Sequence, residues 1–230
     1  SVVLALGVQR MARQNAIVKK LSSVETLGSA SVICSDKTGT LTRSEMTIER
    51  VMTASGSSRI TGTGYAPDGQ VEHEGAALTS GPVHQEHVAV LSGGSLAGNA
   101  ELRQTAGGEW RIEGDPTEAA FLVAERKFGM TERRKRRFER VGEIPFTSER
   151  KMMSTIECDH ENGDAVLVIT KGAPDVLLGR CTRVRVGMET VELDAALSKR
   201  ILTDVDTLSD AALRTLAVAY RLLAAGESRD

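Results

Sequence analysis

Apolar residues at the start of the chain are spaced for helices, and then for one short strand. The first stretch has helical spacing to about Gln14, and a Ser-x-x-Glu capping box at Ser22 begins a second helix that Gly28 ends. The next segment, 31–34, is short, apolar and β-branched at its centre, which is typical of a strand buried in a parallel sheet. This pattern places Asp36 just beyond the carboxyl end of the strand, where open α/β sheets bind their ligands.

From about residue 47 onward, short strand-like segments alternate with turns and helices. Strands are predicted at 47–53, 59–63, 141–146, 151–157, 165–170 and 214–220, and helices at 83–96, 174–178 and 193–208. A further helix begins after Asp115, an N-cap residue that precedes Pro116 and stands three residues before Glu118. The Asn-Gly pair at 162–163 predicts a hairpin, and the stretch before residue 82 is predicted to be surface loop. Together these elements predict an α+β fold, with an antiparallel sheet flanked by helices.

The composition narrows the classes of function. The chain has 230 residues, and 29 Lys and Arg against 31 Asp and Glu leave a net charge of −2, which gives no general attraction to nucleic acid. Its three cysteines are widely spaced and include no Cys-x-x-Cys pair, so they indicate neither a disulfide framework nor a zinc site and favour a cytoplasmic setting. The apolar stretch 1–8 is far shorter than the roughly 20 residues of a membrane span and is not a signal peptide, but it is compatible with the stub of a longer membrane helix.

Two further patterns are given ordinary structural interpretations. The basic run 132–137 has acidic residues beside it and no aromatic residues within it, which favours a solvated helix face over a surface for nucleic acid. His73, His84 and His87 lie in a polar region without nearby cysteines, so we expect surface histidines rather than a metal site.

Asp36 is the candidate nucleophile. It lies in the segment Ile-Cys-Ser-Asp-Lys-Thr-Gly-Thr-Leu-Thr at 33–42, where Thr38, Gly39 and Thr40 supply hydroxyls and an unobstructed backbone beside the carboxylate. A carboxylate placed in line can attack phosphorus if amides, hydroxyls and a metal neutralise the charge on the phosphoryl oxygens. The alternative is an Asx turn in which Asp36 only caps the loop.

Residues 35–42, SDKTGTLT, resemble the phosphorylation motif of P-type ATPases without departure. The segment also resembles the wider haloacid-dehalogenase superfamily, whose phosphatases carry a second aspartate at the position of Thr38. That aspartate acts as acid and base, and threonine cannot replace it. The resemblance therefore implies that Asp36 accepts a phosphoryl group from ATP, that Mg2+ (magnesium) binds at Asp36 and Thr38, and that the phosphoaspartate persists until another group supplies a base.

The resemblance to type II cation pumps covers nearly the whole chain. Motifs occur in the order of the nucleotide-binding domain of those pumps at 62–69 (GTGYAPDG), 114–119 (GDPTEA), 145–151 (PFTSERK), 171–174 (KGAP) and 213–220 (LRTLAVAY). The family implies a membrane-helix stub and the first part of a Rossmann-like, dehalogenase-type phosphorylation domain at 1–46. It implies a nucleotide-binding domain at 47–222 and a tail at 223–230.

The resemblance also assigns the residues that bind ATP. Phe146 stacks on the adenine, Lys171 and Gly172 line the adenine pocket, and Glu118 reaches the adenine amino group. Lys151 and Arg214 contact the phosphates. Ser148 departs from the best-known calcium pumps, which carry an arginine there, and this removes one phosphate contact.

Each assignment competes with a structural alternative. Phe146, at the end of a strand, can instead pack in the core. Lys171 and Gly172 can form an ordinary surface turn, and Arg214 can belong to a surface ion pair. Glu118 can instead be the capping-box partner of Asp115.

The family implies a parent enzyme in the cell membrane that couples ATP hydrolysis to cation transport. We expect this cytoplasmic segment to bind ATP without turning it over, and its partners to be the rest of the phosphorylation domain, the actuator domain and the membrane helices. The resemblance does not extend to the heavy-metal pumps, whose nucleotide domain uses a His-Pro pair, because no histidine here precedes proline. Calcium-pump-like is the preferred subclass, and sodium and proton transport are the alternatives. The transported cation is not bound here and cannot be identified. The rival classes are a dehalogenase-type phosphatase and a non-catalytic interaction module.

Overall fold

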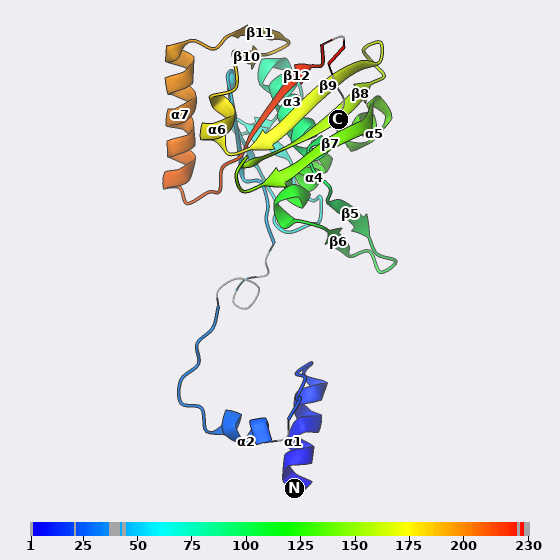
Figure 1. The fold of residues 1–230 in the computed structure, drawn as a ribbon, viewed down its shortest axis with the longest axis vertical. Coiled ribbons are helices and arrows are strands. Elements are labelled where there is room, and N and C mark those ends of the chain that lie inside the picture. Colours follow the sequence, from blue (N-terminus) through cyan, green and yellow to red (C-terminus); the bar gives the residue numbers. More distant parts are fainter. Residues whose placement is uncertain (1, 21, 37–41, 43–44, 225, 228–230) are drawn as a thin grey trace. The chain divides into compact units, whose positions relative to one another are not determined.

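The computed structural model describes all residues except 1, 21, 37–41, 43–44, 225 and 228–230 (Figure 1). The chain forms two compact units, Ser1–Ser44 and Glu45–Asp230. In the first unit, helices α1 (Val2–Arg13) and α2 (Ser22–Gly28) form where the sequence predicts them. No helix in the described part of the chain is long and apolar enough to cross a membrane.

The strand predicted at 31–34 is wrong in this structure. These residues have no regular secondary structure, and the side chains of Val32 and Ile33 are 75% and 90% exposed. An apolar strand is stable when neighbouring strands pair with it and cover its faces. The described residues of the first unit contain no other strand that could do so. Asp36 therefore follows an exposed, irregular segment.

The second unit is built on a four-stranded antiparallel sheet, and this part of the predicted fold class is confirmed. Its order is β12 (Ala217–Leu222), β9 (Ala165–Gly172), β8 (Met152–Asp159) and β7 (Phe138–Thr147). The predicted hairpin joins β8 to β9, with positive φ at Gly163 and Asp164. Helix α3 (Gly81–Leu96) packs against β9 and β12 (Figure 1). The resulting core contains Leu96, Ala97 and Ile169, with Val218 packed on it.

Small residues in α3 allow its close packing. A Cβ atom on Gly93 would lie 2.9 Å from Val218 of the sheet, and one on Gly94 would enter the ring of Phe121. Phe121 belongs to α4 (Pro116–Lys127), which packs along α3. The two glycines thus fix how α4, with Glu118 in its first turn, lies beside the sheet.

A second sheet, in the order β1-β2-β3-β4, packs through Val51, Ile60 and Val71 against Leu91 of α3. Its strands are β1 (Arg50–Thr53), β2 (Gly56–Ile60), β3 (Val71–His73) and β4 (Ala76–Ala77). The strand predicted at 59–63 is therefore shifted, because Thr53 pairs with Gly56 in a tight hairpin. The loop predicted before residue 82 contains β3 and β4, so that prediction is wrong in part.

The remaining elements are short or peripheral. They are β5 (Glu101–Gln104), β6 (Trp110–Glu113), α5 (Thr131–Arg137), α6 (Pro174–Leu178), β10 (Arg183–Val186), β11 (Glu189–Glu192) and α7 (Ala195–Asp210). The hairpins β5–β6 and β10–β11 were not predicted, because each of their strands has only four residues and most of these are exposed. The apolar alternation in β6 (Trp-Arg-Ile-Glu) and β10 (Arg-Val-Arg-Val) is too short to stand out from a loop.

The solvated-face interpretation of the basic run is wrong for two arginines of α5. Arg134 Nε lies 2.8 Å from a carboxylate oxygen of Glu125, whose side chain is fully buried. Arg137 lies 2.6 Å from Asp159, whose side chain is 2% exposed. A buried carboxylate needs a paired cation, so these arginines hold α5 against α4 and β8.

The surface interpretation of the histidines is wrong for His87. Its ring is buried in α3, with Nε2 2.6 Å from the Ser58 hydroxyl and Nδ1 2.8 Å from the carbonyl of Val83. Burial lowers the pKa of His87 below its ordinary value. A neutral ring that both donates and accepts a hydrogen bond satisfies this position without a metal.

Candidate functional site

Strand register places five predicted site residues at one end of the main sheet. One residue from each strand forms a row of directly paired positions, namely Thr147, Met152, Gly172 and Ala217. Phe146, Lys151 and Lys171 each precede a member of that row, and Arg214 stands three residues before Ala217. Adjacent strands lie roughly 4.8 Å apart, so the row spans about 14 Å. Neighbouring members of this row are 5, 20 and 45 residues apart in the chain, and they meet over a length comparable to a nucleotide.

Phe146 presents an aromatic face to solvent. It lies in β7 at a point where the pairing with β8 is irregular. The regular pairs on either side are Ile144 with Ser154 and Thr147 with Met152. The residue is 59% exposed, so the core-packing alternative is wrong. An exposed ring at the end of a sheet is available for stacking.

Gly172 is explained by the packing of β8 on β9. A Cβ atom there would lie 2.6 Å from the carbonyl oxygen of Lys151 and 2.6 Å from Cβ of Met152. The same carbonyl accepts a hydrogen bond from Ala173 N at 3.0 Å. Lys151 itself has a positive φ of 54° and ends a tight turn that Thr147 begins. The glycine therefore positions the strand ends that carry Lys151 and Lys171.

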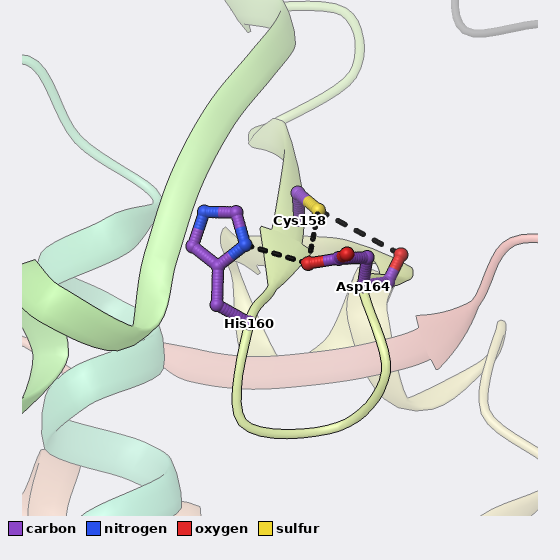
Figure 2. A group of neighbouring side chains, drawn as sticks. All are labelled: Cys158, His160 and Asp164. Carbon is purple, nitrogen blue, oxygen red and sulfur yellow. Dashed lines mark hydrogen bonds and ion pairs between the residues drawn. The ribbon is translucent and has the colours of Figure 1, made fainter.

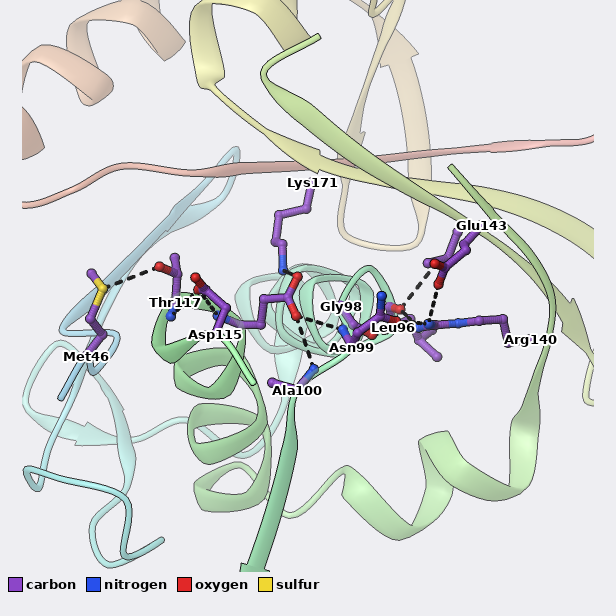
Figure 3. A network of polar contacts seen from close by, with 12 residues as sticks. Met46, Leu96, Gly98, Asn99, Ala100, Asp115, Thr117, Arg140, Glu143 and Lys171 are labelled. Carbon is purple, nitrogen blue, oxygen red and sulfur yellow. Dashed lines mark hydrogen bonds and ion pairs between the residues drawn. The ribbon is translucent and has the colours of Figure 1, made fainter. Parts of the chain in front are cut away.

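Lys171 is a buried cation without a hydrogen bond. It is 7% exposed and points from β9 toward α4 (Figure 3), so the surface-turn alternative is wrong. Its Nζ lies 3.6 Å from Glu118 Oε1 and 5.3 Å from the centre of the Phe121 ring, and it has no hydrogen-bond partner. Burial lowers the pKa of Lys171, and the Glu118 carboxylate only partly opposes this. Such an ammonium group leaves its hydrogen-bonding capacity open to a ligand.

Glu118 is held by the loop that follows α3. Its Oε2 accepts hydrogen bonds from the backbone amides of Asn99 at 2.7 Å and Ala100 at 3.1 Å. The capping-box alternative is therefore wrong for this side chain, although Asp115 is the N-cap, as predicted, and accepts from Thr117 N at 2.7 Å. With Oε2 committed to two amides, Oε1 is the oxygen that faces Lys171.

Arg140 fixes the same loop, and nothing in its sequence context indicated this role. Its guanidinium donates to the Asn99 side chain at 2.6 Å, to the carbonyl of Gly98 at 2.8 Å and to the carbonyl of Leu96 (Figure 3). It also pairs with Glu157 at 3.2 Å. Burial raises the pKa of Glu157, and the Arg140 charge opposes this. Arg140 thus links the sheet to the loop that orients Glu118.

Arg214 is exposed in the segment before β12 and lies near the start of α4. Partial burial raises the pKa of Asp115, but hydrogen bonds from Thr117 and Glu118 lower it more, and the charge of Arg214 adds to the lowering. The pKa of Asp115 consequently lies below its ordinary value. Both interpretations of Arg214, a surface ion pair and a phosphate contact, remain open.

Asp36 belongs to the first unit, where it is exposed and its carbonyl accepts a hydrogen bond from the Ser35 hydroxyl at 3.2 Å. Thr38, the other predicted catalytic and magnesium-binding residue, lies outside the described residues. The nucleophile and its magnesium therefore remain sequence-based predictions.

Comparisons with known proteins converge on one family. A family model described as P-type ATPase, cytoplasmic domain N, matches residues 86–230. A calcium-transporting ATPase of Bacillus subtilis is 41% identical over 99% of this chain and 25% of its own length. A probable cation-transporting ATPase F of Mycobacterium tuberculosis is 39% identical over 94% of this chain and 23% of its own length. The chain thus spans about a quarter of the curated relatives it matches.

Proposed function

Because this chain belongs to the P-type ATPase family, we propose that it is the ATP-binding segment of a cation pump whose phosphorylated residue is Asp36. The observation that carries the proposal is the row of strand ends, which brings Phe146, Lys151 and Lys171 together with the loop of Arg214. The proposed nucleotide-binding domain is 47–222, between a first part of the phosphorylation domain at 1–46 and a tail at 223–230.

The adenine end of the nucleotide binds between an exposed ring and a buried ion pair. Phe146 supplies the stacking face, which contributes about 1–3 kcal/mol per base in comparable sites. Lys171 Nζ donates to a ring nitrogen, which gives this buried ammonium the acceptor that it lacks. Glu118 Oε1 accepts from the amino group of the base, since Oε2 already accepts from two backbone amides.

The phosphates extend toward the exposed cations of the same sheet end. Lys151 and Arg214 neutralise phosphate charge. The best-known calcium pumps have an additional arginine at the position of Ser148, and serine cannot supply the two-pronged phosphate contact of that guanidinium. Binding that rests on one stacked base and a few polar contacts is expected to be weak, with a dissociation constant between tens of micromolar and about 1 mM.

The chemical step in the parent pump is transfer of the γ-phosphoryl group to Asp36. One carboxylate oxygen forms a bond to phosphorus as the bond to the bridging oxygen breaks, and ADP leaves with the electron pair. Bound magnesium supplies charge neutralisation on the phosphoryl oxygens. Thr38 cannot serve as a base, so water attacks the phosphoaspartate only when another domain supplies one.

The remaining parts of the pump supply what this chain does not carry. In the proposed assembly, residues 31–34 pair with further strands of a Rossmann-like phosphorylation domain, which gives that apolar segment the partners it lacks here. Membrane helices carry the transported cation, and the actuator domain acts on the phosphoenzyme. This chain alone binds ATP without appreciable turnover.

The test is a titration of the full chain with ATP, followed by calorimetry or amide chemical shifts. We expect saturable binding that Phe146→Ala weakens by about 5- to 150-fold, which corresponds to the loss of one base stack. Leu222→Ala is the matched control, because Leu222 is 61% exposed and belongs to the same sheet, five paired positions away from the row. A flat titration with folded protein, or equal weakening by both substitutions, contradicts the proposal and favours an interaction module.

A further inference from the structure

A Cys-His-Asp cluster lies in the hairpin between β8 and β9. The side chains of Cys158, His160 and Asp164 point toward one another (Figure 2). His160 Nδ1 is 2.7 Å from Asp164 Oδ1, and Cys158 Sγ is 3.9 Å from the same oxygen. One potential ligand atom from each residue lies within 4.8 Å of the others.

We infer that Cys158, His160 and Asp164 form a binding site for a divalent transition-metal ion, with Zn2+ as the best match. A thiolate, an imidazole nitrogen and a carboxylate oxygen are the donors that zinc takes in proteins. Hard cations such as calcium and magnesium prefer sites made of oxygen alone. Three protein ligands leave the fourth tetrahedral position to water.

The geometry requires only a small adjustment of the hairpin. Metal–ligand bonds of about 2.0–2.3 Å in a tetrahedron separate ligand atoms by about 3.3–3.7 Å. Cys158 is fixed, because it lies in β8 and pairs with Val166 of β9. The last pair of the two strands is Asp159 with Ala165, so His160 and Asp164 lie in the loop between them. On binding, the hydrogen bond between His160 and Asp164 opens and the Sγ to Oδ1 distance shortens slightly. The Cys158 thiol and His160 Nδ1, which donates to Asp164 before binding, each lose one proton to solvent as the S–Zn and N–Zn bonds form, and Nε2 keeps its proton.

Glu139 supports the imidazole from outside the cluster. Its Oε2 lies 3.4 Å from His160 Nε2, the nitrogen that faces away from Asp164. A carboxylate that accepts from one ring nitrogen leaves the other free to bind metal, and this arrangement is common around zinc-bound histidines. The ring is therefore oriented for coordination through Nδ1.

The site is separate from the proposed nucleotide site. Cys158 and Met152 are six residues apart along β8, which corresponds to about 20 Å. The metal holds the turn at one end of the β8–β9 pair, while Lys171 and Gly172 lie at the other end. The inference consequently does not depend on ATP binding. The cysteine spacing did not indicate it, because the ligands follow a Cys-x-His-x-x-x-Asp pattern with one cysteine.

The experiment is a titration of the full chain, with Cys34→Ser and Cys181→Ser in place so that Cys158 is the only thiol. Zn2+ binding is followed by calorimetry, and Co2+ serves as the spectroscopic probe. We expect one ion per chain and a thiolate-to-cobalt charge-transfer band. Cys158→Ser, His160→Gln and Asp164→Asn are each expected to weaken Zn2+ binding by at least about tenfold.

Asn162→Ala is the matched control, because Asn162 lies in the same loop and only its backbone forms hydrogen bonds. This variant should bind Zn2+ like the background protein. Absence of saturable binding overturns the inference, as does binding that survives both His160→Gln and Asp164→Asn. If a variant fails to fold, the cobalt spectrum of the background protein still decides, because a spectrum without the thiolate band refutes coordination by Cys158.

Discussion

Replacing Lys171 with methionine is predicted to stabilise the fold while it weakens ATP binding. The ammonium group is nearly fully buried and has no hydrogen bond, and its ion-pair partner, Glu118 Oε1, stands 3.6 Å away. Methionine has a similar length and fills the space beside Phe121 without carrying a charge. The substitution removes a desolvated cation and keeps most of the packing.

The sign of the expected gain follows from the pKa of Lys171. Burial lowers this pKa more than Glu118 raises it, so the folded state disfavours the charged form. Replacing buried charged groups by apolar side chains of similar volume is often neutral or stabilising by about 1–4 kcal/mol. Glu118 is not left as an unpaired buried charge, because it keeps its hydrogen bonds from Asn99 and Ala100. We expect an increase of about 1 kcal/mol in the free energy of unfolding, or about 2–4 °C in Tm for a chain of this size.

The pH dependence gives the sign of the effect independently. A lysine whose folded pKa is lowered binds fewer protons when folded than when unfolded, between the folded pKa and its ordinary value of 10.5. The destabilisation by Lys171 is therefore fully present below the folded pKa and disappears as the pH rises toward 10.5. The stability difference between Lys171→Met and the natural protein should narrow over that range.

The assay is thermal and urea unfolding followed by circular dichroism, from neutral to alkaline pH, with and without ATP. Under the proposed function, ATP should stabilise the natural protein by RT ln(1 + [ATP]/Kd), and Lys171→Met should show a smaller shift. Lys135→Met is the control, because Lys135 is exposed and should change neither quantity. A variant that is less stable than the natural protein at neutral pH, or a difference that widens with pH, refutes the reasoning and means that the ion pair with Glu118 dominates.

Two further substitutions test the framework of the site by chemical unfolding. Gly172→Ala places Cβ 2.6 Å from the carbonyl oxygen of Lys151 and should lower the free energy of unfolding by about 1–3 kcal/mol. The control Gly179→Ala, whose new Cβ would have no contact closer than 3.8 Å, should be tolerated. Equal effects of the two substitutions would contradict the packing argument. Arg140→Ala removes the cation paired with the buried Glu157 and should lower the free energy of unfolding by about 3–5 kcal/mol. Arg140→Lys should recover only part of this stability, because lysine lacks the planar guanidinium with its several fixed donors. Full recovery by lysine would show that the charge alone matters.

The main sheet and the helices beside it were predictable because their signals are local. Asp115 and Pro116 mark the start of α4 whatever surrounds them, and the Asn-Gly pair at 162–163 closes a hairpin between neighbouring segments. The strand at 31–34 failed for the opposite reason, since an apolar run indicates a buried strand only when a sheet is present to receive it. The hairpin β5–β6 was missed because each of its strands has only four residues, so the alternation in Trp-Arg-Ile-Glu of β6 is too short a signal, and their mutual pairing defines them.

The candidate site shows the same division between local and long-range information. Motifs proposed Phe146, Lys171 and Glu118 as site residues one at a time, but could not indicate which of their atoms are left without a hydrogen-bond partner. That depends on contacts from distant segments: Asn99 and Ala100 use one oxygen of Glu118, and Arg140 fixes the loop that carries these amides. The result is a buried ammonium group without a hydrogen-bond acceptor, which we predict to destabilise the empty fold. In the proposed complex a nucleotide supplies this acceptor and removes part of that cost, so the same feature that is unfavourable in the empty fold would contribute to affinity.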